Sequence, residues 1–167
     1  MGKRGQMKLS FGMIFSIILI IIFIAFAIYT INIFLGIQKS ASSGKLFNDV
    51  QRDVDKIWNS EESLREFEYF LPRGVDSVCF VDFSSDKKGI AENLYNDLER
   101  ISFREGNFVL YSEGLKSGSD FSSKEIENIN IEQTTYIDNP LCFRGSSGKV
   151  KITLKKDFNE SSVTIVK

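Results

Sequence analysis

The chain has 167 residues, of which 43% are hydrophobic, a formal net charge of −1 and no histidine. The lack of histidine excludes Ser–His and Cys–His nucleophile pairs and removes the commonest general acid–base group. The first 38 residues hold three basic and no acidic residues, whereas the remainder holds 18 basic and 22 acidic residues. Because this larger part carries a net charge of −4 and nucleic-acid binding requires a basic surface, we expect no nucleic-acid partner.

The segment from Leu9 to Gln38 carries no charged residue and is mostly apolar. About 20 apolar residues in a helix cross the hydrocarbon core of a bilayer, and a lone spanning segment is helical because its backbone groups can pair only within it. The sequence therefore predicts a transmembrane helix over residues 9–37. Three basic residues precede this helix, namely Lys3, Arg4 and Lys8. Since positive residues stay on the cytoplasmic side, we expect a single-pass protein of the cell membrane with a cytoplasmic leader at residues 1–8 and an extracellular C-terminal domain.

A removable secretory signal is the alternative to a permanent anchor. The apolar core of such a signal is about 7–15 residues long and ends at a cleavage site of small residues. The apolar segment here is about twice that length, and Tyr29–Asn32 offers no such site. The length of the segment therefore favours permanent anchoring.

The residues just before the apolar segment read Lys3-Arg4-Gly5-Gln6. This pattern, followed closely by a long apolar run, resembles the class III signal segment of archaeal type IV pilins. The resemblance implies that a prepilin peptidase cuts between Gly5 and Gln6 and that the apolar helix then packs against other pilin-like subunits in the core of a filament.

Two positions differ from the pattern of that family. Ser10 stands where the family usually has Glu, and Lys8 stands where it prefers an apolar residue. The alternative interpretation is that the basic cluster only orients an ordinary membrane anchor.

The segment after the anchor, residues 38–63, begins with small residues. Gly36, Ser40 and Gly44 recur every four residues, so they either form one close-packing face of a continuing helix or belong to a loose Ser/Gly linker. The apolar residues of Leu46–Trp58 recur at steps of three and four, which predicts an amphipathic helix packed on its own domain. The alternative is that part of this apolar face contacts a neighbouring subunit.

Beyond Glu66 the hydrophobic pattern changes to the period of two that is typical of strands. We also expect one short helix with its apolar face at Ile90, Leu94, Leu98 and Ile101, and a loop over Glu113–Lys124. Strands are predicted at Glu66–Leu71, Ser77–Phe83, Asn107–Tyr111, Glu125–Glu132, Leu141–Arg144, Val150–Lys155 and Val163–Lys167. The predicted fold class is therefore α+β, with a long N-terminal helix followed by a mainly antiparallel, extracytoplasmic β-rich domain over residues 64–167.

The two cysteines, Cys79 and Cys142, lie in similar apolar strand sequences. Outside the membrane such a pair is most simply a disulfide, and two buried free thiols are the alternative. Two cysteines without histidine leave too few of the usual ligands for zinc, so we expect no metal site.

Three further motifs are candidates for a catalytic, binding or modification site. Asp82 has no partner carboxylate or base at a recognisable spacing, so we expect it to pair locally at a strand end. Gly145–Lys149 superficially resembles a phosphate-binding loop, but it lacks the first glycine and the following Ser or Thr, which favours a turn. Asn159-Glu160-Ser161 offers an acceptor for an N-glycan, although a motif this short also arises by chance.

Taken together, these patterns indicate a structural or binding protein rather than an enzyme, with no catalytic residue and no cofactor. The expected partners are membrane lipid and, from the resemblance, other pilin-like subunits contacted through the N-terminal helix. The alternative is a membrane-tethered domain that binds a ligand or partner without assembling into filaments. Carboxylate-only catalysis stays open in principle, but no acidic pair stands out.

Overall fold

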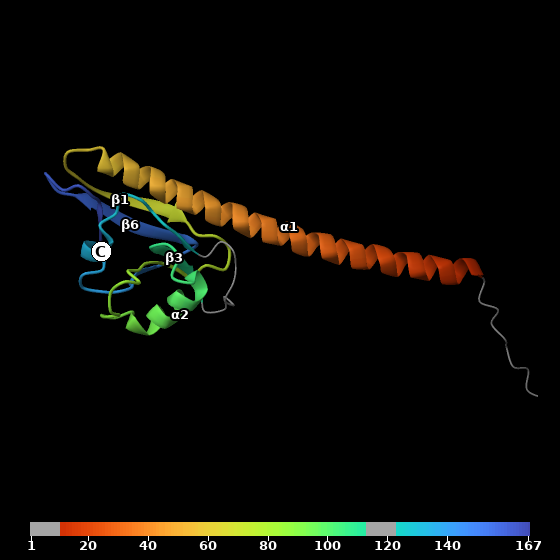
Figure 1. Ribbon diagram of the computed structural model, residues 1–167. Helices are drawn as coiled ribbons and strands as arrows, with labels where there is room; N and C mark the ends of the chain where they lie inside the picture. Colours follow the sequence, from red (N-terminus) through yellow and green to blue (C-terminus); the bar gives the residue numbers. More distant parts are fainter. Residues whose placement is uncertain (1–10, 113–122) are drawn as a thin grey trace, which may run out of the picture. The chain divides into compact units, whose positions relative to one another are not determined.

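The computed structural model describes residues 11–112 and 123–167 of the chain. It divides into two compact units, Met1–Gln38 and Lys39–Lys167, and the second unit is called the head below. Helix α1 (Phe11–Trp58) continues from the first unit into the second (Figure 1). Gly36, Ser40 and Gly44 are therefore helical, and the alternative of a loose Ser/Gly linker is wrong.

Within the head, residues 46–58 of α1 form the predicted amphipathic helix. Its apolar side chains are buried with at most 4% of their surface exposed, namely Leu46, Phe47, Val50, Val54 and Ile57. On the polar side Arg52 donates a hydrogen bond to Asp49 at 2.8 Å. Trp58 differs from the prediction: its ring is 39% exposed at the rim, where its Nε1 donates to the carbonyl of Ser161 at 2.9 Å.

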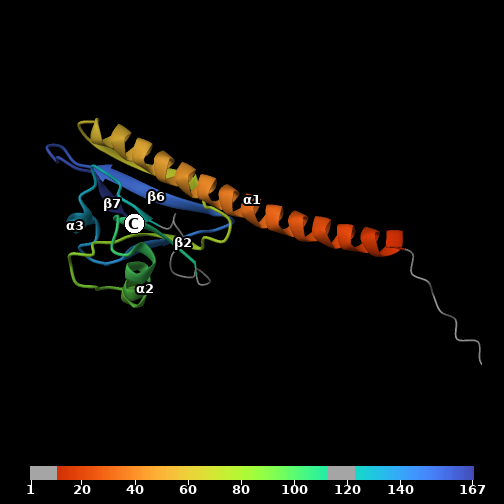
Figure 2. The ribbon, with the colours of Figure 1, turned by 45° about the vertical axis from the view of Figure 1, so that its right-hand side comes forward.

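In the described part of the head, seven strands form two antiparallel sheets (Figures 1 and 2). Sheet A has the order β1-β6-β7, with β1 at Ser63–Phe70, β6 at Lys149–Lys156 and β7 at Thr164–Val166. Sheet B has the order β4-β3-β2-β5, with β4 at Ser123–Lys124, β3 at Phe108–Tyr111, β2 at Ser77–Phe80 and β5 at Leu141–Arg144. The fold is therefore α+β, as the sequence predicts.

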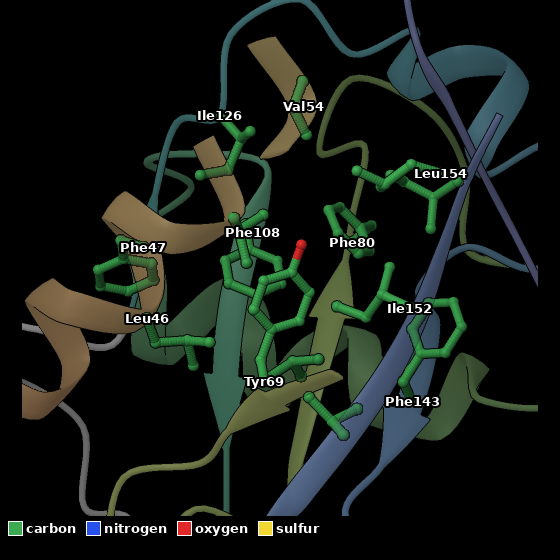
Figure 3. Close-up of a cluster of buried hydrophobic side chains, with 14 of the residues drawn as sticks. Leu46, Phe47, Val54, Tyr69, Phe80, Phe108, Ile126, Phe143, Ile152 and Leu154 are labelled. Carbon is green, nitrogen blue, oxygen red and sulfur yellow. The ribbon is translucent and has the colours of Figure 1, made fainter. Parts of the chain in front are cut away.

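The main hydrophobic core lies between α1 and the two sheets. Figure 3 shows side chains from α1 directed toward side chains from β2, β3, β5 and β6. Phe108 is fully buried, with its ring centroid 5.8 Å from Phe47 and 4.8 Å from Phe80. Because successive residues of a strand face opposite sides, Val78 and Phe80 enter this core while Cys79 faces the other side of sheet B.

A second, smaller cluster covers that other side of sheet B. Helix α2 (Glu92–Ser102) packs Leu98 against Cys79, Val81 and Val109, all buried. Figures 1 and 2 both place α2 on the side of the head opposite α1. The head thus has helices on both faces of its sheet region.

Several predicted elements differ from the structure. The strand predicted at Glu125–Glu132 is wrong, because Asn128 turns the chain with a φ of 64° and residues Ile131–Thr134 form the short helix α3. Ile90 lies outside α2 and is 89% exposed, although the sequence places it on the buried face of that helix. The predicted strand Ser77–Phe83 ends at Phe80. Of the loop predicted at Glu113–Lys124, residues 113–122 lie outside the described residues and the last two residues form β4.

Candidate functional site

The first unit consists of an apolar helical segment, Gly12–Gln38, whose side chains are all exposed. At about 1.5 Å per residue it reaches roughly 40 Å, against about 30 Å for the hydrocarbon core of a bilayer. Two of its hydroxyl groups are satisfied within the helix: Ser16 donates to the carbonyl of Gly12 and Thr30 to that of Phe26, each at 2.8 Å. It is the one helix in the described part of the chain that is long and apolar enough to span a membrane.

The predicted cleavage pair, Gly5 and Gln6, lies outside the described residues. Processing of the leader therefore stays a prediction from the sequence.

The cysteines Cys79 and Cys142 are joined by a disulfide. They lie directly opposite each other on β2 and β5, with their Cα atoms 4.1 Å apart. Cys79 is fully buried in the second hydrophobic cluster beside α2, whereas Cys142 is half-buried at the edge of that cluster. This placement fits a structural link between two adjacent strands of the sheet.

Asp82 pairs locally, as the sequence predicts. Its carboxylate accepts hydrogen bonds from the Ser84 amide at 2.9 Å, the Ser84 hydroxyl at 2.7 Å and the Ser85 hydroxyl at 2.6 Å. These bonds engage the carboxylate within its own loop. Asp82 therefore stabilises the loop that follows β2, and no candidate base contacts its carboxylate among the described residues.

Asn139 completes this loop, and sequence reasoning missed it. Its side chain is fully buried, donates to the carbonyl of Asp82 at 2.9 Å and accepts from the Asp82 amide at 3.1 Å. A signal for this role was present, because an asparagine just before Pro140 and the apolar strand Leu141–Arg144 is a polar residue at the edge of a buried segment.

Replacing Asp82 by Asn should destabilise the head in a pH-dependent way. Burial raises the pKa of Asp82, but the hydrogen bonds from Ser85 and Ser84 outweigh it and hold that pKa below its ordinary value. A carboxyl with a lower pKa in the folded chain adds stability above the unfolded pKa of about 3.9, and this is lost as pH falls through the folded pKa. We expect Asp82→Asn to cost about 1–3 kcal/mol near pH 6, with the difference from wild type shrinking below about pH 4.

The fluorescence of Trp58, the only tryptophan, can follow this unfolding for the full chain in detergent. Asp86→Asn is the matched control, because Asp86 is exposed on the same loop and its replacement should change stability by less than about 0.5 kcal/mol. An Asp82→Asn deficit that stays constant from pH 6 to pH 2.5 would contradict the assignment.

Tyr69 carries a buried hydroxyl that makes no hydrogen bond among the described residues. Figure 3 draws it in the main core, with its oxygen in red. A hollow of about 230 Å³ lies beside it, lined also by Asp49, Arg52 and Asp53. Burial raises the pKa of Tyr69 far above its ordinary value, and the negative charge of Asp53 adds to the effect. The described residues hold no cluster of three or more Cys, Asp or Glu suited to a metal ion.

Replacing Tyr69 by Phe should therefore be neutral or stabilise the head by about 1–2 kcal/mol, since the cost of a buried unpaired hydroxyl is removed. Tyr95→Phe is the control, because the Tyr95 hydroxyl donates to the carbonyl of Ser85 at 3.2 Å. That change should cost about 0.5–1.5 kcal/mol in the same thermal unfolding experiment. A larger loss for Tyr69→Phe than for Tyr95→Phe would show that the Tyr69 hydroxyl has a partner.

A second surface feature is formed by Ile90, Tyr136 and Ile137, which are 89%, 72% and 79% exposed and are called the apolar loop patch below. Two loops present these side chains, and Lys88 and Asn139 join the loops by backbone hydrogen bonds of 3.0 and 2.9 Å. The patch borders a groove of about 380 Å³ that Ile137 helps to line. These bonds tie the backbones of the two loops together, and the exposed apolar side chains on them make the patch a candidate for binding a partner.

The remaining candidates lie in turns. Gly145–Lys149 forms a turn between β5 and β6, with Ser146 and Lys149 exchanging backbone hydrogen bonds of 2.8 and 3.0 Å, as predicted. Asn159 lies exposed in the turn between β6 and β7. Within the described part of the head, the two cysteines are therefore brought together, whereas Asn159 and Asp82 lie in separate loops.

Comparisons of the chain with protein-family models, with curated protein sequences and with solved structures find no match.

Proposed function

We propose that this chain is a single-pass membrane-anchored protein with an extracytoplasmic head, acting as a structural or interaction subunit. The specific form of the proposal is a type IV pilin-like subunit or minor pilin that joins its assembly through the apolar helix. The observation that carries it is the uncharged segment Gly12–Gln38, exposed on every side and long enough to span a bilayer. A surface this apolar is stable in lipid or against other apolar helices rather than in water.

Two further features support the proposal. The apolar helix leads into a helix that forms one wall of the core of a β-rich head, and this order of elements resembles the layout of type IV pilins. The disulfide between Cys79 and Cys142 is typical of proteins outside the reducing cytosol. Both features fit a head on the outer side of the membrane.

The mass of the mature chain and its N-terminal residue test the pilin-like form directly. The wild-type protein should begin at Gln6 and should be recovered in filaments sheared from the cells. Gly5→Val should block cleavage and keep the leader, whereas Gly2→Val, a matched glycine replacement in the same leader, should still be cut. A wild-type chain with an intact Met1 or Gly2 end, found only as a membrane-bound monomer, would contradict the pilin-like form.

A tethered binding domain is the second candidate, and the apolar loop patch favours it. Large apolar side chains that are exposed close together commonly mark an interaction surface. This candidate predicts that the uncut monomer stays in the membrane with its head accessible to a membrane-impermeant amine reagent on intact cells. Recovery of the processed chain in sheared filaments would count against it.

A further inference from the structure

The turn between β6 and β7 presents Asn159 at the surface in a fixed conformation. The Glu160 amide donates to the carbonyl of Asp157 at 3.1 Å, and the Asp157 amide donates to the Glu160 carboxylate at 3.1 Å, which closes the turn from both sides. Asn159 occupies the left-handed region with a φ of 68°, a conformation that Asn adopts more readily than most residues. The turn geometry alone thus explains an asparagine at this position, but it does not require a hydroxyl two residues later.

The side chains of Asn159 and Ser161, the two residues that define the acceptor motif, make no hydrogen bond to another element among the described residues. The side-chain amide of Asn159 makes no hydrogen bond among the described residues. The side-chain amides of Asn107 and Asn139, by contrast, form buried hydrogen bonds with the backbone. In the part of the chain that the structure describes, the one hydrogen-bond partner of the Ser161 hydroxyl is the neighbouring hydroxyl of Ser162, at 3.4 Å. Asn159 is also the only asparagine of the chain that is followed two residues later by Ser or Thr, with no proline between. The fold leaves both motif side chains accessible to an enzyme.

We propose that Asn159 is an N-glycosylation site, and this inference rests on the proposed extracytoplasmic position of the head. The sugar donor would be a lipid-linked oligosaccharide phosphate or pyrophosphate. The Asn159 Nδ2 forms a bond to the anomeric carbon of the first sugar and loses one proton. The bond from that carbon to the lipid phosphate oxygen breaks, and the lipid phosphate or pyrophosphate leaves with the electron pair. No oxidant or reductant is needed.

The surroundings of the turn suit an attached glycan. Phe158 precedes Asn159 and is 64% exposed, so a sugar ring that lies on it removes apolar surface from water. Ser161 is fixed to the end of α1 by its hydrogen bond from Trp58, whereas the chain enters the head at Lys39. The helix covers about 28 Å between Lys39 and Trp58 at about 1.5 Å per residue, so the acceptor lies well away from the point of entry. A glycan at Asn159 therefore lies at the end of the head that is remote from Lys39.

Mass spectrometry of the full chain purified from membranes of its source organism tests the proposal. Trypsin cleaves after Lys156, so the C-terminal peptide Asp157–Lys167 contains the whole motif. We expect most copies of this peptide to carry added sugar mass on Asn159. Ser161→Ala should abolish the modification, whereas Ser161→Thr and the matched control Ser162→Ala should keep it.

Labelling intact cells with a membrane-impermeant amine reagent separates this inference from the proposed function. An unmodified Asn159 on a head that the reagent labels would overturn the glycosylation site and leave the extracytoplasmic position standing. Sugar mass that persists in Ser161→Ala would also overturn the site. A head that is labelled only after the cells are lysed would overturn both the position and the site.

Discussion

Replacing Phe108 by Ala should lower the free energy of unfolding by about 3–5 kcal/mol. Phe108 is fully buried at the centre of the main core, between Phe47 of α1 and Phe80 of the neighbouring strand. Truncation removes the apolar contacts of the whole ring and leaves a cavity that α1 and sheet B can fill only in part. A loss of this size is a large share of the total stability of a small domain, so the variant head should be partly unfolded at moderate temperature.

Thermal unfolding of the full chain in detergent, followed by the fluorescence of Trp58, measures this effect. Phe103→Ala is the matched control, because Phe103 is 70% exposed and its removal should change stability by less than about 0.5 kcal/mol. Equal losses for the two variants would mean that Phe108 does not lie in a tightly packed core.

The second large effect is expected from removing the disulfide. The bond joins residues separated by 63 positions, and restricting the unfolded chain over a loop of that length contributes about 4 kcal/mol in the chain-entropy description. The double variant Cys79→Ala/Cys142→Ala should therefore lose about 4 kcal/mol. Truncation of the fully buried Cys79 side chain adds a small packing loss on the side of α2.

Reduction of the wild-type protein measures the contribution of the bond alone, because it breaks the bond between the two sulfur atoms and leaves both cysteine side chains in place. Unfolding midpoints in urea should fall markedly when a thiol reductant is present, while the double variant should not respond to the reductant. A wild-type midpoint that is the same with and without reductant would contradict a stabilising role for the bond.

Elements with strong periodicity could be predicted from the sequence. The spacing of Leu46, Phe47, Val50, Val54 and Ile57 matches the helical period because one face of α1 is buried. The alternation in β6 is equally clear, since Val150, Ile152 and Leu154 are buried in the core while the residues between them, Lys151 and Thr153, are exposed and half-buried on the other face. Each pattern is clear in the sequence because only one face of the helix or strand is buried.

Other features could not be predicted because they depend on distant parts of the chain. The stretch Glu125–Glu132 alternates like a strand, but Ile126 is buried by contacts with the rest of the core and Asn128 turns the backbone. Ile90 matches the helical spacing of α2, yet the Ile90 amide is held by the Asp138 side chain 48 residues away. The roles of Asn139 and Tyr69 likewise arise only when separate loops and strands meet.

Some features of the candidate site could likewise be predicted from the sequence, and others could not. The apolar segment and the pairing of the two cysteines follow from local composition and from counting, so the sequence could predict them. The apolar loop patch could not be predicted, because Ile90 and Tyr136 are brought together only by the hydrogen bonds between their loops.

Because α1 forms part of the core, it determines at which residue a truncated fragment of the head, prepared without detergent, can begin. Residues 46–57 of this helix supply one wall of the hydrophobic cluster, so a fragment starting at Ser63 would expose the apolar faces of both sheets and would be expected to aggregate. A fragment starting at Lys39 keeps that wall and omits the apolar segment. The natural place to trim the polypeptide for crystallisation or NMR therefore lies in the middle of a helix and not in a loop.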